Sequence, residues 1–157
     1  MIGYIPSVLV YALHDGKALL MHRNKEPNFG LWIAPGGKVE LGESPHDTAR
    51  REMAEETGLE IEVRDLCMRG FCTEVSSLPE WQWFLFIFVT TRFQGTLKAD
   101  RREGDLAWIS LGEYFTTLPI PQADAIFAPR VLTMNEGYFQ AKFVYNERLE
   151  LVEWVEY

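Results

Sequence analysis

Three glutamates in the middle of the chain have a spacing that places them on one face of a helix. Glu52, Glu55 and Glu56 fall within a narrow arc, because successive helical residues are about 100° apart around the axis. Like charges four residues apart cost roughly 0.2–0.5 kcal/mol, and anions in the last turn oppose the helix dipole. No Lys or Arg lies four residues after any of the three. We therefore expect either a solvated acidic face or a site where a cation from outside the helix, such as a hard divalent metal, binds these oxygens.

The residues around the glutamates carry the signals of a helix with defined ends. Ser44 is a good N-cap, Pro45 suits the first helical position, and Asp47 stands three residues after the cap. Gly58 can adopt the left-handed backbone that commonly follows a helix end. The sequence thus predicts a helix that begins at Pro45 and ends near Thr57.

A longer pattern contains these glutamates. It consists of Gly37, five residues, Glu43, seven residues, and then the run REMAEETGL at 51–59. This stretch resembles the Nudix box, G-x5-E-x7-R-E-U-x-E-E-x-G-U with U aliphatic, and it matches at every fixed position. Such a match is far more specific than a lone glycine-rich loop. The resemblance implies an α/β protein with the Nudix fold, an α/β/α sandwich with a mixed β-sheet and the box as a loop–helix–loop.

The resemblance also implies a metal site. In the family the box helix binds Mg²⁺, or alternatively Mn²⁺, through its glutamates, and a backbone carbonyl of Gly36 or Gly37 is a further candidate ligand. A fourth carboxylate outside the box commonly serves as a metal ligand or general base, and Glu103 in the run REGDLAW is the candidate; the alternative is a solvated loop acid. The expected metal ligands are Gly37, Glu52, Glu55, Glu56 and Glu103.

The expected catalytic set is Arg51, Glu55, Glu56 and Glu103. Within it, Arg51 is interpreted with Glu43 as an orienting pair, a structural salt bridge between the loop and the helix. The family reaction is attack of water on a phosphorus of a nucleoside diphosphate linked to another group. For a nucleoside triphosphate, the products are the monophosphate and pyrophosphate.

The region after the box favours one branch of the family. No Pro occurs there until Pro79, unlike the ADP-ribose branch, and the Tyr typical of the dinucleoside polyphosphate branch is also missing. What remains resembles the branch that removes oxidised nucleotides, the 8-oxo-dGTP diphosphatases. Ile33, however, stands where some of those enzymes have an Asn, so a broad range of dNTPs or NTPs fits equally well. The alternatives are a Nudix hydrolase of dinucleoside polyphosphates or nucleotide sugars, and a nucleotide-binding module without hydrolysis.

Five residues are candidates for substrate binding. Lys38 follows the glycines and is either a phosphate contact or a solvated charge. Asp124 either reads a purine edge or caps a helix at Ala125–Leu132. Aromatic residues, namely Trp32, Trp83 and Phe127, either stack on a base or belong to the core.

Composition limits the partners. The chain has 157 residues, 47% of them hydrophobic, and a net charge of −8, which is ordinary for a globular protein. We expect one domain over residues 1–157. The negative charge argues against binding to nucleic acid polymers or anionic membranes. No membrane-spanning run or signal peptide is visible, and Cys67 and Cys72 are expected to be reduced thiols. These features predict a cytoplasmic monomer or homodimer that binds a small nucleotide.

The remaining elements must position the box. Alternation and turn residues predict a hairpin of Ile5–Leu13 and Lys17–Arg23 and a buried central strand at Trp81–Thr91. Two short helices are expected, and Pro129 is expected to shorten or end the second. The other expected elements are a strand at Leu31–Ile33, a tight connection at Ala34–Gly37, a strand at Glu60–Val75 bent at Gly70, a loop at Phe93–Gly104, a strand at Leu106–Leu111, helices at Gly112–Leu118 and Ala123–Leu132, and a C-terminal hairpin of Tyr138–Tyr145 and Leu149–Tyr157.

Overall fold

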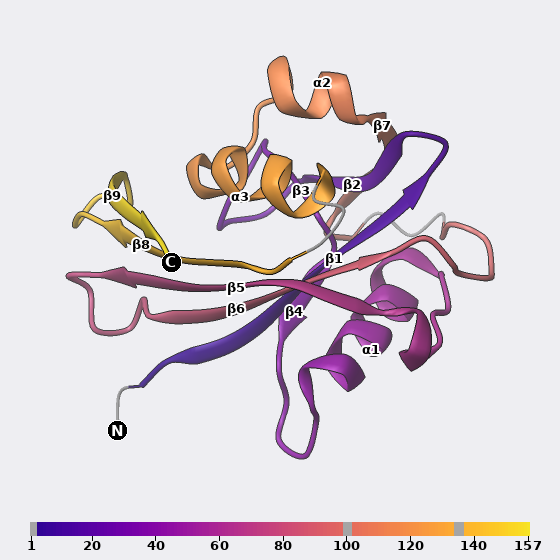
Figure 1. The fold of residues 1–157 in the computed structure, drawn as a ribbon, viewed down its shortest axis with the longest axis horizontal. Coiled ribbons are helices and arrows are strands. Elements are labelled where there is room, and N and C mark those ends of the chain that lie inside the picture. Colours follow the sequence, from indigo (N-terminus) through magenta and orange to yellow (C-terminus); the bar gives the residue numbers. More distant parts are fainter. Residues whose placement is uncertain (1–2, 99–101, 134–136) are drawn as a thin grey trace.

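The computed structural model describes residues 3–98, 102–133 and 137–157 (Figure 1). Part of the predicted loop at Phe93–Gly104 lies outside these ranges. In the described residues, the strands form one sheet in the order β3-β2-β1-β6-β5-β8-β9, with β4 paired to β1 and β7 paired to β2. The strands are β1 Ile5–His14, β2 Lys17–Arg23, β3 Trp32–Ile33, β4 Gly36–Lys38, β5 Cys67–Ser76, β6 Trp83–Thr90, β7 Gly104–Ser110, β8 Phe139–Tyr145 and β9 Leu151–Glu156.

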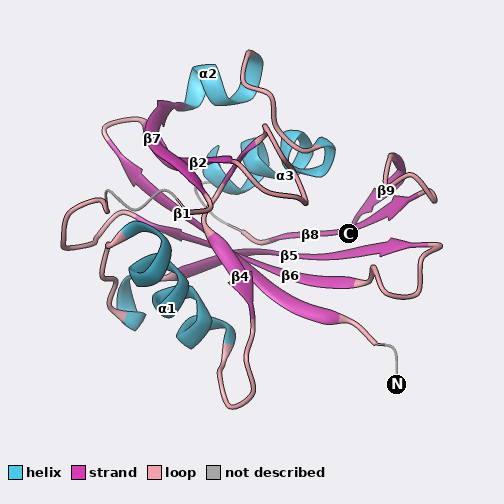
Figure 2. Cartoon of the chain, turned by 180° about the vertical axis from the view of Figure 1, so that it is seen from behind, coloured by secondary structure: helices cyan, strands magenta, loops and turns pink. Residues whose placement is uncertain are grey.

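The sheet is mixed and lies between helices on both faces. The pairs β1–β6 and β5–β8 are parallel, and the other pairs are antiparallel. The helix α1 (Pro45–Thr57) covers one face, while α2 (Leu111–Thr116) and α3 (Gln122–Thr133) cover the other, as Figures 1 and 2 show. A short 3₁₀ turn, η1, spans Val63–Asp65. The predicted α/β/α sandwich is confirmed.

Alternation along the strands divides the interior into two apolar cores. Val8 and Val10 of β1 are buried with Met53 of α1 in one core, whereas Tyr11 is buried with Phe127 of α3 in the other. The cores follow from the period of two in a strand, which sends successive side chains to opposite faces. The strand β6, which lies between β1 and β5, carries apolar residues on both faces, as predicted for a central strand.

Local signals define α1 as expected. The Ser44 hydroxyl accepts from the Asp47 amide at 3.1 Å, and the Ser44 amide donates to the Asp47 carboxylate at 2.9 Å, which completes a capping box. At the other end, Gly58 has φ of 81° and its amide donates to the Ala54 carbonyl at 3.1 Å. The predicted helix from Pro45 to Thr57 is therefore confirmed.

Three predicted elements need correction. The strand expected from Glu60 begins only at β5, because the preceding residues form an isolated bridge and η1; the bend expected at Gly70 is present as a register shift. The tight connection expected before the box contains the short strand β4. The helix α3 continues past Pro129 to Thr133, since burial of its apolar side against the sheet offsets the missing amide hydrogen bond.

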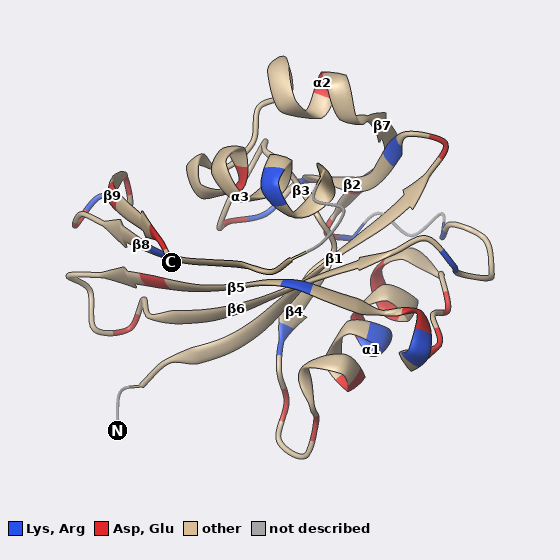
Figure 3. Ribbon diagram, viewed as in Figure 1, with Lys and Arg blue, Asp and Glu red and all other residues tan. Residues whose placement is uncertain are grey.

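No helix in the described ranges is both long enough and apolar enough to cross a membrane. Charged residues gather on α1 and the loops beside it, whereas β6 carries none (Figure 3). Both cysteines are free thiols, as predicted, with Cys67 exposed and Cys72 buried.

The close packing of β4 on β1 generates a stability prediction. A Cβ at Gly36 would overlap the backbone carbonyl of Val8, whereas a Cβ at Gly112 in α2 would meet nothing within 4 Å. We expect Gly36→Ala to lower the free energy of unfolding by about 1–3 kcal/mol through overpacking. The matched control Gly112→Ala should be neutral or stabilising by up to about 1 kcal/mol, because Ala is the better helix former. Urea denaturation of both variants tests this, and equal stabilities would contradict it.

Candidate active site

The two glycines before the box bring a strand backbone into contact with the glutamates of α1. The Gly36 amide donates to Glu56 Oε2 at 3.1 Å. At Gly37, a Cβ would overlap the Glu52 carboxylate. A larger residue at Gly36 would overlap the β1 backbone, and one at Gly37 would displace the Glu52 carboxylate. With the hydrogen bond from Gly36 to Glu56, this close packing makes β4 and α1 one unit.

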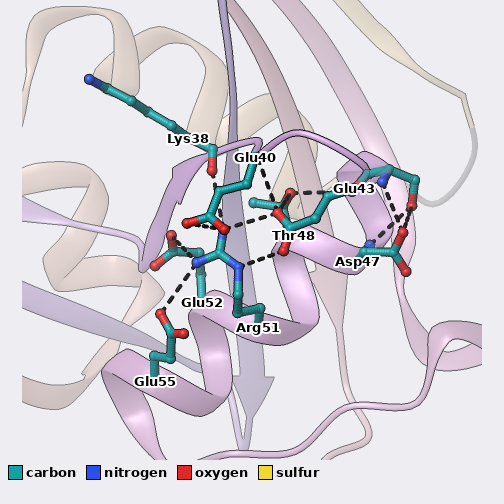
Figure 4. Close-up of polar contacts among 9 residues, drawn as sticks. Lys38, Glu40, Glu43, Asp47, Thr48, Arg51, Glu52 and Glu55 are labelled. Atoms are coloured by element: carbon teal, nitrogen blue, oxygen red, sulfur yellow. Dashed lines mark hydrogen bonds and ion pairs between the residues drawn. The ribbon is translucent and has the colours of Figure 1, made fainter.

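A single guanidinium organises the acids at the surface of α1 (Figure 4). Arg51 Nε and Nη2 donate to the two oxygens of Glu43 at 2.6 and 3.0 Å, in a bidentate pair. The same side chain donates from Nη1 to Glu52 at 2.9 Å and to Glu55 at 3.3 Å, and from Nη2 to the Lys38 carbonyl at 3.3 Å. Arg51 thus ties the loop to the helix, as the orienting role predicts.

The position of Arg51 corrects the expectation that compensating charge comes from outside the helix, and it also explains the lowered pKa of Glu43. Part of the charge compensation comes from inside the helix, because Arg51 precedes Glu55 by one turn. Hydrogen bonds from Arg51, followed by one from the Thr48 hydroxyl at 2.7 Å, lower the pKa of Glu43 to about 2. Glu43 is therefore ionised at neutral pH and holds Arg51 in place.

The acidic cavity, about 490 Å³ in volume, lies beside this unit. Its acids are Glu52, Glu55, Glu56 and Glu103, and its cations are Lys25, Lys98 and Arg102. Burial raises the pKa of Glu56 to about 8, with further contributions from the charge of Glu52 and a hydrogen bond to Glu103, and burial likewise raises the pKa of Glu52. The cavity thus concentrates carboxyl groups that lack sufficient positive charge.

Glu103 reaches this cavity through strand pairing. It precedes β7, whose register on β2 sets Gly104 opposite Arg23. Arg23 Nη1 lies 3.3 Å from Glu103 Oε2, and the Glu103 carboxyl hydrogen-bonds the Glu56 side chain. The structure therefore brings the predicted fourth carboxylate next to the box.

The donor chemistry of the acidic cavity suits a divalent cation. Within residues 3–98, 102–133 and 137–157, no three Asp, Glu, His or Cys side chains converge as a preformed metal-ligand set. Instead, Glu52 and Glu55 contact Arg51, and Glu56 contacts the Gly36 amide and Glu103. All the donors are hard oxygens, the ligands that Mg²⁺ prefers. Burial, with neighbouring acids, raises the pKa of Glu52 and of Glu56, and a bound cation would compensate their negative charge. Rotation of these side chains toward the cavity would be needed to form the site.

A second cavity, of about 530 Å³, is lined by aromatic side chains. Trp81, Trp83, Glu74, Asp124 and Tyr145 contribute to its walls, together with Ile33. Along the chain, the two linings come closest at the loop after β2, where Lys25 lines the acidic cavity and the next residue, Glu26, lines the aromatic cavity. A molecule with an anionic end and a flat aromatic end fits this pair of cavities.

Size alone does not locate the site. A larger groove, about 960 Å³, lies between the opposite flank of α1 and residues 60–65 and 91–94. Its lining includes Arg51 but not Glu52, Glu55 or Glu56. The glutamates of the box therefore line the smaller, acidic cavity and not this groove.

The structure alters the prediction for two of the aromatic residues that were expected to stack on a base, Phe127 and Trp32. Phe127 is fully buried and packs edge-on against Phe143 at 6.3 Å, so the expectation that it stacks on a base is wrong and its alternative as a core residue holds. The half-buried Trp32 ring stacks on His22 at 4.8 Å, so one of its faces is occupied. Trp83, in contrast, lines the aromatic cavity.

The two charged candidates for substrate binding, Lys38 and Asp124, both lie near the aromatic cavity. Lys38 Nζ is 5.7 Å from the centroid of the Trp83 ring, and its side chain extends away from Arg51 (Figure 4). Asp124 is 6% exposed and lies within the first turn of α3, which begins at Gln122. The alternative that Asp124 caps a helix at Ala125–Leu132 is therefore wrong, since the helix starts earlier and Asp124 faces the aromatic cavity.

Glu74 and Tyr145 line the aromatic cavity but were not predicted to belong to a site. The Tyr145 hydroxyl donates to Glu74 Oε1 at 3.3 Å. Burial raises the pKa of Glu74 to about 7, and burial followed by the charge of Glu74 raises the pKa of Asp124 well above its usual value. The available signal was an acid inside the apolar β5 sequence, where a charge is costly unless it has a partner.

Comparisons with known proteins agree with this geometry. The NUDIX domain family model matches residues 3–131. An uncharacterized Nudix hydrolase of Bacillus subtilis, YvcI, is 31% identical over 143 residues, which cover 89% of this chain and 86% of that protein. A second Bacillus subtilis protein, provisionally named 8-oxo-dGTP diphosphatase, is 30% identical over 110 residues, covering 69% of this chain and 68% of its own. The crystal structure of a mutator MutT protein from Bacillus halodurans superimposes with a TM-score of 0.85 at 28% identity, covering 97% of both chains.

The fold and the site together define an α/β/α hydrolase with a carboxylate-rich centre. The chain belongs to the NUDIX domain family and is a MutT-like Nudix hydrolase. Hydrolases of this family generally use a divalent metal ion and act on small nucleotide substrates.

Burial of Glu74 predicts a pH-dependent stability. The pKa of Glu74 in the folded protein, about 7, is above its ordinary value of 4.5. The contribution of Glu74 to the free energy of unfolding is therefore fully present below about pH 4.5 and is lost as the pH rises through 7. Relative to Glu74→Gln, the wild type should therefore lose up to about 3 kcal/mol between pH 5 and pH 8. Urea denaturation of both proteins at these two pH values measures the change, and a constant difference would contradict the prediction.

Proposed function

We propose that this protein is a Mg²⁺-dependent pyrophosphohydrolase of nucleoside triphosphates, which releases the monophosphate and pyrophosphate. The observation that carries the proposal is the presence of two cavities, one lined by carboxylates and cations and the other by aromatic side chains. A triphosphate suits the first and a base suits the second. The whole chain, residues 1–157, is proposed to act as one domain, because β8 and β9 extend the same sheet.

The residues of the acidic cavity have separate tasks in this proposal. When bound by Glu52, Glu55, Glu56 and Glu103, with the Gly37 carbonyl as a further ligand, a divalent cation supplies charge neutralisation at phosphate oxygens and lowers the pKa of water. Glu103, which is 41% exposed, is proposed to accept a proton from the attacking water. Arg51 is a positioning residue, since it holds Glu43, Glu52 and Glu55.

Cations around the acids offset the overall negative charge of the chain. Lys25, Lys98 and Arg102 line the acidic cavity, and the Lys98 ammonium donates to the Glu55 carbonyl at 2.6 Å. Lys38, whose Nζ lies 5.7 Å from the centroid of the Trp83 ring, is proposed to contact the substrate phosphates close to the base. These side chains favour an anionic substrate despite the net charge of −8.

The aromatic cavity supports a base as the other end of the substrate. Trp83 offers a ring for stacking, and Asp124 offers a buried carboxyl for hydrogen bonds to a base edge. The relative provisionally named 8-oxo-dGTP diphosphatase favours an oxidised dNTP among the substrates. Ile33, which lines the same cavity, cannot hydrogen-bond to a base, and this favours a wider range of dNTPs or NTPs. A cytoplasmic location fits both the free thiols of Cys67 and Cys72 and a nucleotide substrate.

Two substitutions in the acidic cavity test the reaction. Glu56→Gln and Glu103→Gln each remove an anion and a hard oxygen ligand while keeping the size of the side chain. We expect kcat for Mg²⁺-dependent hydrolysis to fall at least about a hundredfold, with a smaller change in KM, because these groups act mainly in the transition state. Pyrophosphate release across a panel of nucleoside triphosphates measures this.

The exposed neighbour Asp105 supplies the control for this experiment. Asp105→Asn makes a comparable change on β7, outside the acidic cavity, and should keep kcat within about threefold, as expected for a surface substitution. Circular dichroism checks that each variant is folded. Near-wild-type turnover in both Gln variants would refute the metal and catalytic assignments.

Asp124→Asn tests base recognition. In the wild type, a protonated Asp124 both donates and accepts hydrogen bonds, whereas an Asn amide presents a different geometry to the base edge. We expect the ratio of kcat/KM between purine and pyrimidine triphosphates to change by about fivefold or more, since a lost buried hydrogen bond costs ~1–3 kcal/mol. Mg²⁺ dependence should stay the same. Unchanged substrate ratios in a folded variant would remove Asp124 from the binding site.

A further inference from the structure

The C-terminal hairpin lies beyond the part of the chain that defines the family. The NUDIX domain model ends at residue 131, whereas β8 and β9 span Phe139–Glu156. The hairpin nevertheless contributes Tyr145, Arg148 and Leu149 to the wall of the aromatic cavity. The cavity is therefore incomplete without a segment that the family pattern does not include.

The hairpin is held firmly against the rest of the cavity. Parallel pairing of β8 with β5 sets Tyr145 opposite Ser76 and Phe143 opposite Glu74. The Tyr145 ring packs edge-on against Trp81 at a centroid distance of 4.7 Å. At the start of β9, the Leu151 amide donates to Gln122 Oε1 of α3 at 2.8 Å. These contacts leave the Tyr145 side chain little freedom.

Tyr145 forms a cluster of polar side chains with Glu74 and Asp124 inside a largely apolar cavity. Its hydroxyl donates to Glu74 on β5, and Glu74 is close enough to Asp124 on α3 for its charge to act on that carboxyl. Three elements thus present a phenol and two carboxyls to the same space. Carboxyls in such surroundings favour the neutral form, which both donates and accepts hydrogen bonds.

We infer that the C-terminal hairpin is a specificity element, in which Tyr145 holds Glu74 to read the edge of a purine base. This rests on the proposed hydrolysis of nucleoside triphosphates. A carboxyl that donates and accepts at once complements a base edge with a donor beside an acceptor. The cavity of about 530 Å³, with Trp81 and Trp83 in its walls, suits a fused two-ring base better than a single ring. Glu74 contacts the base directly, and Tyr145 is its positioning residue.

The first experiment measures binding without turnover. Tyr145→Phe removes only the hydroxyl, and Tyr138→Phe is the matched control, because Tyr138 is exposed and its hydroxyl contacts Met68. Dissociation constants for GMP, AMP, CMP and UMP are measured by calorimetry in the presence of Mg²⁺. We expect Tyr145→Phe to weaken binding of a purine monophosphate by about fivefold or more, as for a lost buried hydrogen bond, while pyrimidine binding and the control stay within twofold.

A second pair of variants tests Glu74 itself. Glu74→Gln should change the ratio of purine to pyrimidine binding in the same way, whereas Glu153→Gln on the exposed strand β9 should leave the ratio unchanged. In turnover, the change should appear in KM for purine triphosphates rather than in kcat. The Mg²⁺ concentration for half-maximal activity should stay the same, which separates this role from that of the acidic cavity.

The outcomes distinguish this inference from the proposed function. If the wild type hydrolyses triphosphates but both Tyr145→Phe and Glu74→Gln keep the wild-type ratio of purine to pyrimidine binding, the inference is wrong and the proposed function stands. If the wild type binds monophosphates selectively but hydrolyses no triphosphate, the proposed function fails, and a shifted ratio in the variants still supports the inference. If the wild type binds none of the four monophosphates, the inference is overturned.

Discussion

Repulsion among carboxylates at one edge of α1 is the constraint on which the site depends. Glu52, Glu55 and Glu56 cannot all ionise close together without compensation, because like charges repel and two of the three lie in the unfavourable last turn of the helix. Arg51 supplies one positive charge, and the Gly36 amide supplies a hydrogen bond. The remaining deficit appears as the raised pKa of Glu56, which burial and neighbouring acids cause together.

The glycines of β4 make this arrangement sterically feasible. Any side chain at Gly36 would meet the β1 backbone, and any side chain at Gly37 would meet Glu52. The short strand therefore serves as a spacer of minimal width between the central sheet and the helix. In this way the same residues that define the family pattern also determine the distance between the sheet and the acids.

The two cavities assign catalysis and substrate selection to different parts of the chain. The acidic cavity is built from α1 and from residues near β2 and β7, whereas the aromatic cavity is built from β5, β6, α3 and the C-terminal hairpin. The loop after β2 contributes to both, with Lys25 in the acidic cavity and Glu26 in the aromatic cavity. A substrate that spans both can therefore be selected at one end without changing the groups that act at the other.

The sequence by itself determined the features that depend on neighbouring residues. The bounds of α1, its capping box and the shared face of its glutamates follow from spacing and local hydrogen bonds, so they were predictable. The helix through Pro129 was not, because packing against the sheet outweighed a local signal. The buried position of Phe127 had the same cause, since only the tertiary structure shows which face of α3 packs inward.

Residues far apart in the chain met only through strand pairing. Glu103 was predicted from the family resemblance, but its contact with Glu56 depends on the register of β7 on β2. Glu74 gave one local signal, an acid in a mostly apolar strand, and Tyr145 gave none, because their contact depends on the parallel pairing of β5 with β8. Side-chain spacing along one helix is set by covalent geometry and is readable from the sequence. Register between distant strands is set by the packing of the whole sheet, and only the tertiary structure decides it.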